Sequence, residues 1–266
     1  MSNKILSNKI AVVTGATAFI GQAIAIKLAA LGATVIVNGR NITAGTETVA
    51  QIEELGGKAF FEKADLTQPE EVAAMMKRIN ENHGGIDILA VSGAGASSDS
   101  RSFKFFKDMD IEDIEGYITS HWLTRIHSVK AAYPYMVKRG GGKIIMIGTD
   151  AGRTATVGES MIGGATGGMM QMTRALAREF GRDKIRINTV AMSFIYDALP
   201  RWGEGSEKLE SNDEGKGGMI QNLKKRMLFE VHTTDIAEVV AFFASPASDA
   251  VTGQTLSVNG GLTTPG

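Results

Sequence analysis

The chain has 266 residues, a formal net charge of −1 and a hydrophobic content of 43%. This length is enough for one α/β domain with a substantial core. The near-neutral charge gives no reason to expect nucleic acid or an anionic membrane surface as a partner. The absence of cysteine excludes disulfides, thiolate metal ligands and a cysteine nucleophile. No apolar run approaches the roughly 18 residues of a membrane span, and the start does not resemble a signal peptide, so we expect a cytoplasmic protein without a metal site.

Short apolar runs alternate with stretches of helical periodicity along the whole chain. The expected strands are residues 10–13, 34–37, 59–61, 86–91, 143–147, 185–190 and 255–258. Between the first two, Ile20, Ile24, Leu28 and Leu31 share one helical face. Such alternation predicts a parallel sheet with helices on both sides. We therefore expect a single α/β domain over residues 1–266, a Rossmann-like doubly wound sheet of about seven strands.

The segment 196–230 interrupts this alternation with five glycines and a cluster of charges. It follows the carboxyl end of an expected strand, where open α/β sheets bind ligands. We interpret it as a lid over a substrate; a solvated insertion is the alternative.

A glycine-containing turn follows the first expected strand and opens a helix. Gly15 suits the tight turn and Gly21 allows close packing of helix on strand, so that backbone N–H groups and the helix N-terminus face a pyrophosphate. The middle glycine of the usual pattern is absent, because Ala18 and Phe19 stand there. The expected contacts in this turn are Thr14, Gly15, Thr17, Phe19, Ile20 and Gly21.

The residue that ends the second strand region bears on the choice of dinucleotide. An acidic residue there would bind a ribose 2′-hydroxyl, whereas a basic residue accommodates a 2′-phosphate. Arg40 therefore favours NADP(H) over NAD(H), unless it is only an exposed surface arginine.

Taken together, these motifs resemble the short-chain dehydrogenase/reductase family over nearly the whole chain. Further matching segments are 64–66, 87–95, 173–179, 185–188 and 247–261. The resemblance implies a Rossmann fold, a nicotinamide cofactor, carbonyl or alcohol chemistry and usually a homotetramer. It also adds Asp65, Leu66, Gly95 and Ile195 to the expected cofactor contacts, with Asp65 at the adenine.

The same resemblance locates the positions of the usual catalytic tetrad. In the family a tyrosine donates a proton to the carbonyl oxygen, a lysine lowers the pKa of that tyrosine, a serine binds the substrate oxygen and an asparagine holds water. The corresponding residues here are Ile162, Thr166, Thr149 and His121, of which only Thr149 is a plausible substitute. No tyrosine lies between Tyr135 and Tyr196, so the tyrosine–lysine pair is absent from this segment.

Four polar residues map near the expected pocket and are the candidate catalytic groups. They are His121, Thr149, Asp150 and Glu159. Glu159 lies seven residues before the lysine position, where the related enoyl reductases carry their tyrosine, and His121 titrates near neutrality when unperturbed. The alternatives are a helix-packing role for His121, a helix-start role for Glu159 and a turn or cap role for Asp150.

The helix that begins near residue 160 contains Gly163, Gly164, Gly167 and Gly168, each unfavourable in a helix by up to about 1 kcal/mol. We expect them to permit close packing against a neighbouring subunit; room for a ligand is the alternative. The expected pocket lining is apolar, which indicates a hydrophobic small-molecule substrate; its members are Ile162, Met192, Phe194, Trp202 and Met219.

Three functions remain open at this stage. The first is an NADP(H)-dependent oxidoreductase acting on a carbonyl or activated alkene through a rewired site. The second is a non-redox acid–base enzyme, such as a dehydratase, isomerase or cyclase. The third is a catalytically silent subunit. We expect a homotetramer or homodimer, with a hetero-oligomer as the alternative in the third case.

Overall fold

The computed structural model describes residues 4–93, 105–198 and 224–264. Within them the chain forms a sheet of parallel strands, each at the place where an apolar run predicted it. The strands are β1 (Ile10–Thr14), β2 (Thr34–Gly39), β3 (Lys58–Lys63), β4 (Ile88–Val91), β5 (Gly142–Thr149), β6 (Ile185–Met192) and β7 (Thr255–Val258). Their spatial order is β3-β2-β1-β4-β5-β6-β7, and every described pairing is parallel. The predicted doubly wound α/β fold is confirmed.

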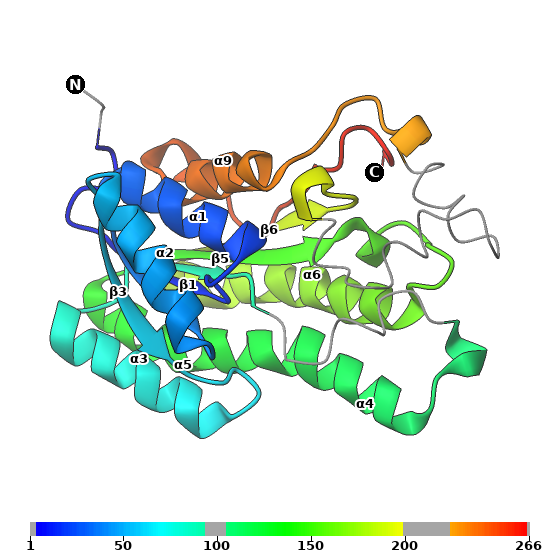
Figure 1. The fold of residues 1–266 in the computed structure, drawn as a ribbon. Helices are drawn as coiled ribbons and strands as arrows, with labels where there is room; N and C mark the ends of the chain where they lie inside the picture. The colour runs from blue at the N-terminus through cyan, green and yellow to red at the C-terminus, as the bar shows by residue number, and fades with distance from the viewer. Residues whose placement is uncertain (1–3, 94–104, 199–223, 265–266) are drawn as a thin grey trace.

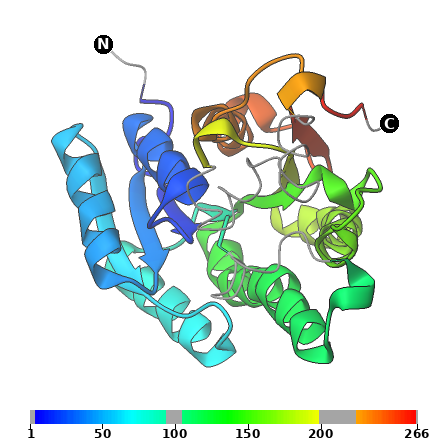
Figure 2. The same cartoon turned by 45° about the vertical axis from the view of Figure 1, so that its right-hand side comes forward.

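Helices cover both faces of this sheet (Figures 1 and 2). The α-helices are α1 (Phe19–Ala30), α2 (Ile42–Glu54), α3 (Pro69–His83), α4 (Ile111–Ile118), α5 (Thr124–Arg139), α6 (Ser160–Phe180) and α9 (Thr233–Ala244). The shorter elements are the 3-10 helices η1 (Phe106–Asp108), η3 (Asp150–Gly152), η4 (Gly181–Asp183) and η6 (Pro246–Ser248), and the π-helical turn η2 (Thr119–Leu123). None of the helices in the described ranges has the combined length and apolarity that crossing a membrane requires.

The hydrophobic core is divided into two layers by the sheet. One layer contains the buried side chains of α1, α2 and α9, and the other those of α3, α5 and α6. Central strands such as β1 and β4 are buried on both faces, which explains why their sequences are continuously apolar instead of alternating.

The order of the strands creates a switch point between β1 and β4. From β1 the chain runs outward through β2 to β3, and then returns to the other side of β1 as β4. The connections leaving β1 and β4 therefore diverge at the carboxyl edge of the sheet, which is where ligands bind in folds of this kind.

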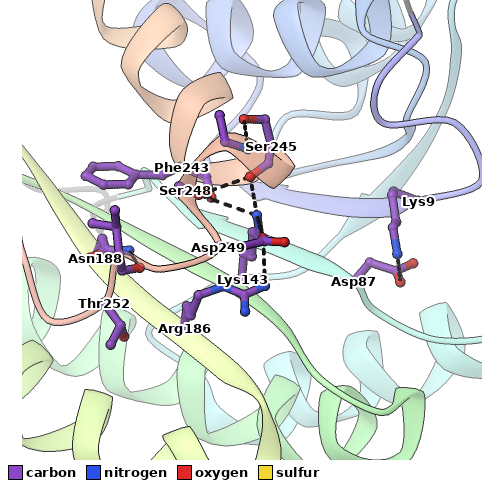
Figure 3. A network of polar contacts seen from close by, with 12 residues as sticks. Lys9, Asp87, Lys143, Arg186, Asn188, Phe243, Ser245, Ser248, Asp249 and Thr252 are labelled. Carbon is purple, nitrogen blue, oxygen red and sulfur yellow. Dashed lines mark hydrogen bonds and ion pairs between the residues drawn. The ribbon is translucent and has the colours of Figure 1, made fainter.

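The opposite edge of the sheet is held by a network of charges (Figure 3). Lys143 at the start of β5 donates to the carbonyl oxygen of Ser245 and pairs with Asp249 at 2.8 Å, while Arg186 at the start of β6 reaches Asp249 at 3.2 Å. Burial lowers the pKa of Lys143, although the Asp249 carboxylate opposes that shift. This network joins the starts of β5 and β6 to the end of α9 and lies far from the carboxyl edge.

Candidate active site

The turn after β1 packs closely against the residues that follow β4 and against the start of α1. Gly15 adopts a φ of +61°, and a Cβ atom at this position would lie 2.4 Å from the Cα of Gly93, which follows β4. A Cβ atom on Gly21 would lie 2.1 Å from the carbonyl oxygen of Gly15. Both glycines are therefore sterically required, as predicted, and they bring the ends of β1 and β4 together at the switch point.

Helix α1 begins at Phe19 with its first turn uncapped by any side chain, because the N-cap residue is Ala18. Phe19 has a φ of +47°, a left-handed conformation that glycine adopts with less strain. Its position lines a groove between α1 and α9 that also includes Thr17, Asp197 and Thr233. Where the usual pattern has its middle glycine, this turn therefore has Ala18 as N-cap and Phe19 in a left-handed conformation.

The ends of β2 and β3 carry the residues expected at the adenosine end of a dinucleotide. Arg40 is half-exposed and forms an ion pair with Asp65 at 3.7 Å. Burial acts to raise the pKa of Asp65, but hydrogen bonds from Thr67 and the charge of Arg40 outweigh it, so that the pKa is lowered. Leu66 is buried and lies against Gly93, as its close approach to a Cβ atom built there shows.

Asn38 supports this region from within the sheet, and sequence reasoning overlooked it. Its fully buried side chain donates to the carbonyl oxygens of Glu62 and Ala64 and accepts a hydrogen bond from the backbone N–H of Gly15 at 3.4 Å. A polar residue in the otherwise apolar run before Gly39 is the signal that could have indicated it.

The end of β5 places Thr149 at the carboxyl edge, opposite Met192 of β6 in the strand register. The Thr149 hydroxyl accepts a hydrogen bond from the N–H of Ala151 at 3.3 Å. Among the described residues, no acceptor takes the hydroxyl proton of Thr149, which leaves it for a ligand oxygen at this edge.

Asp150 is almost fully buried, and both of its carboxylate oxygens are engaged. They accept hydrogen bonds from Ser257, Asn259 and Thr263, and Arg153 forms an ion pair with Asp150 at 3.4 Å. The carboxylate is directed toward β7 and the segment after it, so its contacts are long-range structural ones and differ from the local turn or cap role considered above. The C-terminal donors could not be predicted, because they lie more than 100 residues away in the chain.

His121 lies in the π-helical turn η2, where the helical path of α4 passes into α5. Its side chain is buried, and the imidazole stacks on the ring of Tyr117 with centroids 5.5 Å apart. Both the helix-packing role and a role at the site are compatible with this position. π-helical turns occur frequently at functional sites.

Glu159 is the N-cap residue of α6, but its side chain does not cap the helix. Its carboxyl group has no hydrogen-bond or ion-pair partner among the described residues, and burial raises its pKa to about 7. A carboxyl group of this kind is protonated for part of the time at neutral pH, as a general acid must be.

One and two turns further along α6 are the positions of the family's tyrosine and lysine. Ile162 is partly buried. Thr166 is fully buried and donates its hydroxyl to the carbonyl oxygen of Ile162 at 2.7 Å. Neither side chain supplies a proton donor or a positive charge to the site.

The glycines of α6 make close approaches within the same chain, while their packing against a neighbouring subunit stays a prediction. A Cβ atom on Gly168 would lie 1.9 Å from the Trp122 ring, and one on Gly163 would lie 2.7 Å from the carbonyl oxygen of Ala151. Gly167 packs against Gly152 in the same way, whereas Gly164 faces open space. Three of the four glycines therefore allow η2 and η3 of the same chain to approach α6 closely.

The remaining expected residues divide between core and undescribed segments. Ile195 and Phe194 are buried in the core layer of α9, and Met192 is partly buried. Gly95, Trp202 and Met219 lie outside the described residues, as does most of the expected lid. The two ends of that segment meet at its base, where the N–H of Tyr196 donates to the carbonyl oxygen of Val231 at 2.9 Å.

Comparison with known proteins identifies the class to which this fold and turn belong. Residues 15–263 match the family model described as enoyl-(acyl carrier protein) reductase. The chain is a member of the short-chain dehydrogenase/reductase family, as the sequence motifs predicted, and its relatives support oxidoreductase chemistry.

Individual relatives align over almost their whole length. The chain is 33% identical to the 3-oxoacyl-(acyl-carrier-protein) reductase FabG of Vibrio cholerae, over 97% of this chain and 98% of that one. It is 32% identical to the 7alpha-hydroxysteroid dehydrogenase of Escherichia coli, over 97% of this chain and 96% of that one. Among solved structures, a 7 alpha-hydroxysteroid dehydrogenase complexed with NADH and 7-oxo glycochenodeoxycholic acid matches with a TM-score of 0.85 at 28% identity, covering 98% of this chain and 96% of that one.

Proposed function

We propose that this protein is an NADP(H)-dependent oxidoreductase that reduces the carbonyl or activated alkene of a hydrophobic small molecule, with Glu159 in place of the family's tyrosine as proton donor. The observation that supports this most directly is the partly buried carboxyl of Glu159, which has no partner among the described residues and whose pKa burial raises to about 7.

The turn after β1 fits the diphosphate of a nicotinamide dinucleotide. Gly15 and Gly21 leave no space for side chains, and the uncapped first turn of α1 presents backbone N–H groups. Thr14, Thr17, Phe19 and Ile20 complete this turn in the proposal, with Gly95 and Ile195 at the nicotinamide end. Such a cofactor supplies a hydride when bound.

Arg40 supports NADP(H) as the preferred dinucleotide. Its guanidinium group is half-exposed beside Asp65, where a 2′-phosphate would gain a cationic partner. Asp65 orients Arg40 and, with Leu66, borders the adenine in this proposal. The solved relative with NADH shows that a family member of this likeness takes the other dinucleotide, so the preference requires a direct measurement.

In this proposal, residues of the chain itself bind the substrate oxygen and transfer the proton. The Thr149 hydroxyl donates to the substrate oxygen, and protonated Glu159 transfers its proton as the hydride reaches the adjacent carbon. The proton goes to the oxygen of a carbonyl or to the α-carbon of an activated alkene, and solvent reprotonates Glu159. In this proposal His121, which is buried in η2, is a second group that exchanges protons with the substrate. Asp150 positions the turn after Thr149 through its four hydrogen-bonding partners.

The relatives support a hydrophobic substrate with a ketone or an alcohol. One is named for 3-oxoacyl groups and the other for a hydroxysteroid, and both names describe an oxygen function on a largely apolar skeleton. The partly buried side chains of Ile162 and Met192 at the carboxyl edge suit such a skeleton.

The test combines nucleotide binding with turnover. Calorimetric titration should show NADPH binding more tightly than NADH, and Arg40→Ala should reduce that preference by about 10-fold or more, the loss of one charge-assisted contact. In assays of NADPH oxidation with steroid ketones and 3-oxoacyl thioesters, Glu159→Gln should lower kcat by about 10²- to 10⁴-fold without weakening NADPH binding. Absence of nucleotide binding would contradict the oxidoreductase proposal.

A second function is favoured by one observation, namely that Thr166 bonds to its own helix and offers nothing to a nicotinamide ribose. Glu159 and His121 would then catalyse proton transfer next to a carbonyl without a cofactor, as in a dehydratase or isomerase. Turnover that persists after removal of all nucleotide would support this function and exclude the first.

A further inference from the structure

Arg125 is a buried arginine whose environment lacks the usual partner of such a group. Only 5% of its surface is exposed, and burial lowers its pKa to about 10. No carboxylate contacts it among the residues that the structure describes; its partners are backbone carbonyl oxygens. Charged groups are rarely buried unless paired, so its place in the fold needs an explanation.

The guanidinium group joins two elements that carry candidate catalytic residues. Its Nε and Nη2 atoms donate to the carbonyl oxygen of Ile147 in β5 at 3.3 and 3.1 Å. Its Nη1 atom donates to the carbonyl oxygen of His121 in η2 at 2.8 Å and to that of Ser120 at 3.5 Å. One planar group thus binds the backbone of His121 and the backbone of Ile147, which lies two residues before Thr149.

Arg125 contacts β5 where this strand extends beyond the end of its neighbour β4. Pairing with β4 ends at Met146, whereas pairing with β6 continues to Thr149. Ile147 is therefore the first residue of β5 beyond β4, and Arg125 supplies it with hydrogen bonds from α5. The next residue, Gly148, packs against α6, because a Cβ atom on it would lie 2.5 Å from the Met169 methyl and 3.7 Å from the Thr166 methyl.

We propose that Arg125 is a positioning residue of the candidate site, which holds the π-helical turn carrying His121 at a fixed distance from the end of β5 carrying Thr149. This inference rests on the proposed site and deepens it. Only a guanidinium group suits this position, because its N–H donors point both toward β5 and toward η2. A lysine ammonium on a flexible stem cannot bridge both carbonyl oxygens in the same way.

The test uses Arg125→Met and Arg125→Lys in the full chain. Arg174→Met is the control, since Arg174 is exposed on α6 and, within the described ranges, its side chain bonds only Gln171. The chain has four histidines, so side-chain NMR of histidine-labelled protein gives few signals, and His121→Gln assigns the one of interest. Circular dichroism verifies that each variant is folded; if Arg125→Met is not, Arg125→Lys alone decides the test.

We expect both Arg125 variants to shift and broaden the His121 signal while the signals of the distant His83 and His232 stay in place. In the reductase assay, kcat should fall by about 10- to 100-fold because the polar groups lose their alignment, with the KM for NADPH unchanged. An unaltered His121 signal in folded Arg125→Lys, or an equal change in Arg174→Met, would overturn the inference. If the wild-type protein has no reductase activity, the proposed function fails, but the histidine spectra still decide the role of Arg125.

Discussion

Glu159 makes the stability of this protein depend on pH in a way that a single substitution can reveal. Its pKa is raised by burial from 4.5 to about 7 in the folded protein. The folded state therefore binds the proton more tightly than the unfolded state does. The resulting stabilisation is complete below about pH 4.5 and is lost as the pH rises to about 7.

The magnitude follows from the size of the shift. A difference of about 2.5 pKa units corresponds to roughly 3 kcal/mol, at about 1.4 kcal/mol for each unit. Most of this loss, about 2 kcal/mol, falls between about pH 5.5 and 8.5, the range in which unfolding is convenient to measure. Glu159→Gln removes the ionisation and keeps the shape of the side chain, so it should be more stable than the wild type by an amount that grows by about 2 kcal/mol across this range.

The assay is urea unfolding of the two proteins at several pH values, with Glu53→Gln as a control because Glu53 is exposed on α2. The control should follow the wild type at every pH. A constant difference between Glu159→Gln and the wild type from pH 5.5 to 8.5 would refute the reasoning, since it would mean that the pKa of Glu159 is not raised in the folded protein.

Three further substitutions test other parts of the structure. Gly15→Ala places a methyl group 2.4 Å from the Cα of Gly93, at a residue whose φ is +61°. The variant should therefore have a lower thermal midpoint in differential scanning fluorimetry. Its nucleotide affinity in calorimetry should be lower by about 10-fold or more. Asp150→Asn sets an amide against the donor group of Asn259 and should lower the free energy of unfolding by about 2 kcal/mol in urea; an unchanged value would show that the buried contacts of this carboxylate contribute nothing. Lys143→Met removes the buried hydrogen bonds at the opposite edge and should cost about 1 kcal/mol in the same assay while leaving nucleotide binding unaltered, and a loss of binding would show that the two edges are coupled.

Local features of the sequence were sufficient for the fold and for the turn after β1. The central strands were visible as short apolar runs, because a parallel strand covered by helices on both faces consists largely of apolar residues. Gly15 and Gly21 could be identified because the requirement for glycine depends on backbone geometry within a few residues. The family membership followed from the same motifs.

The tertiary structure alone decided what the polar residues near the site do. Asp150 and Glu159 look alike in the sequence, yet Asp150 meets donors from the C-terminal segment and Glu159 meets none among the described residues. Arg125 could be recognised as a connection between β5 and η2 only once Ile147 was brought beside it. Burial and hydrogen bonding depend on residues distant in the chain, and for that reason periodicity predicts where an element lies but not which of its polar groups remains free to react.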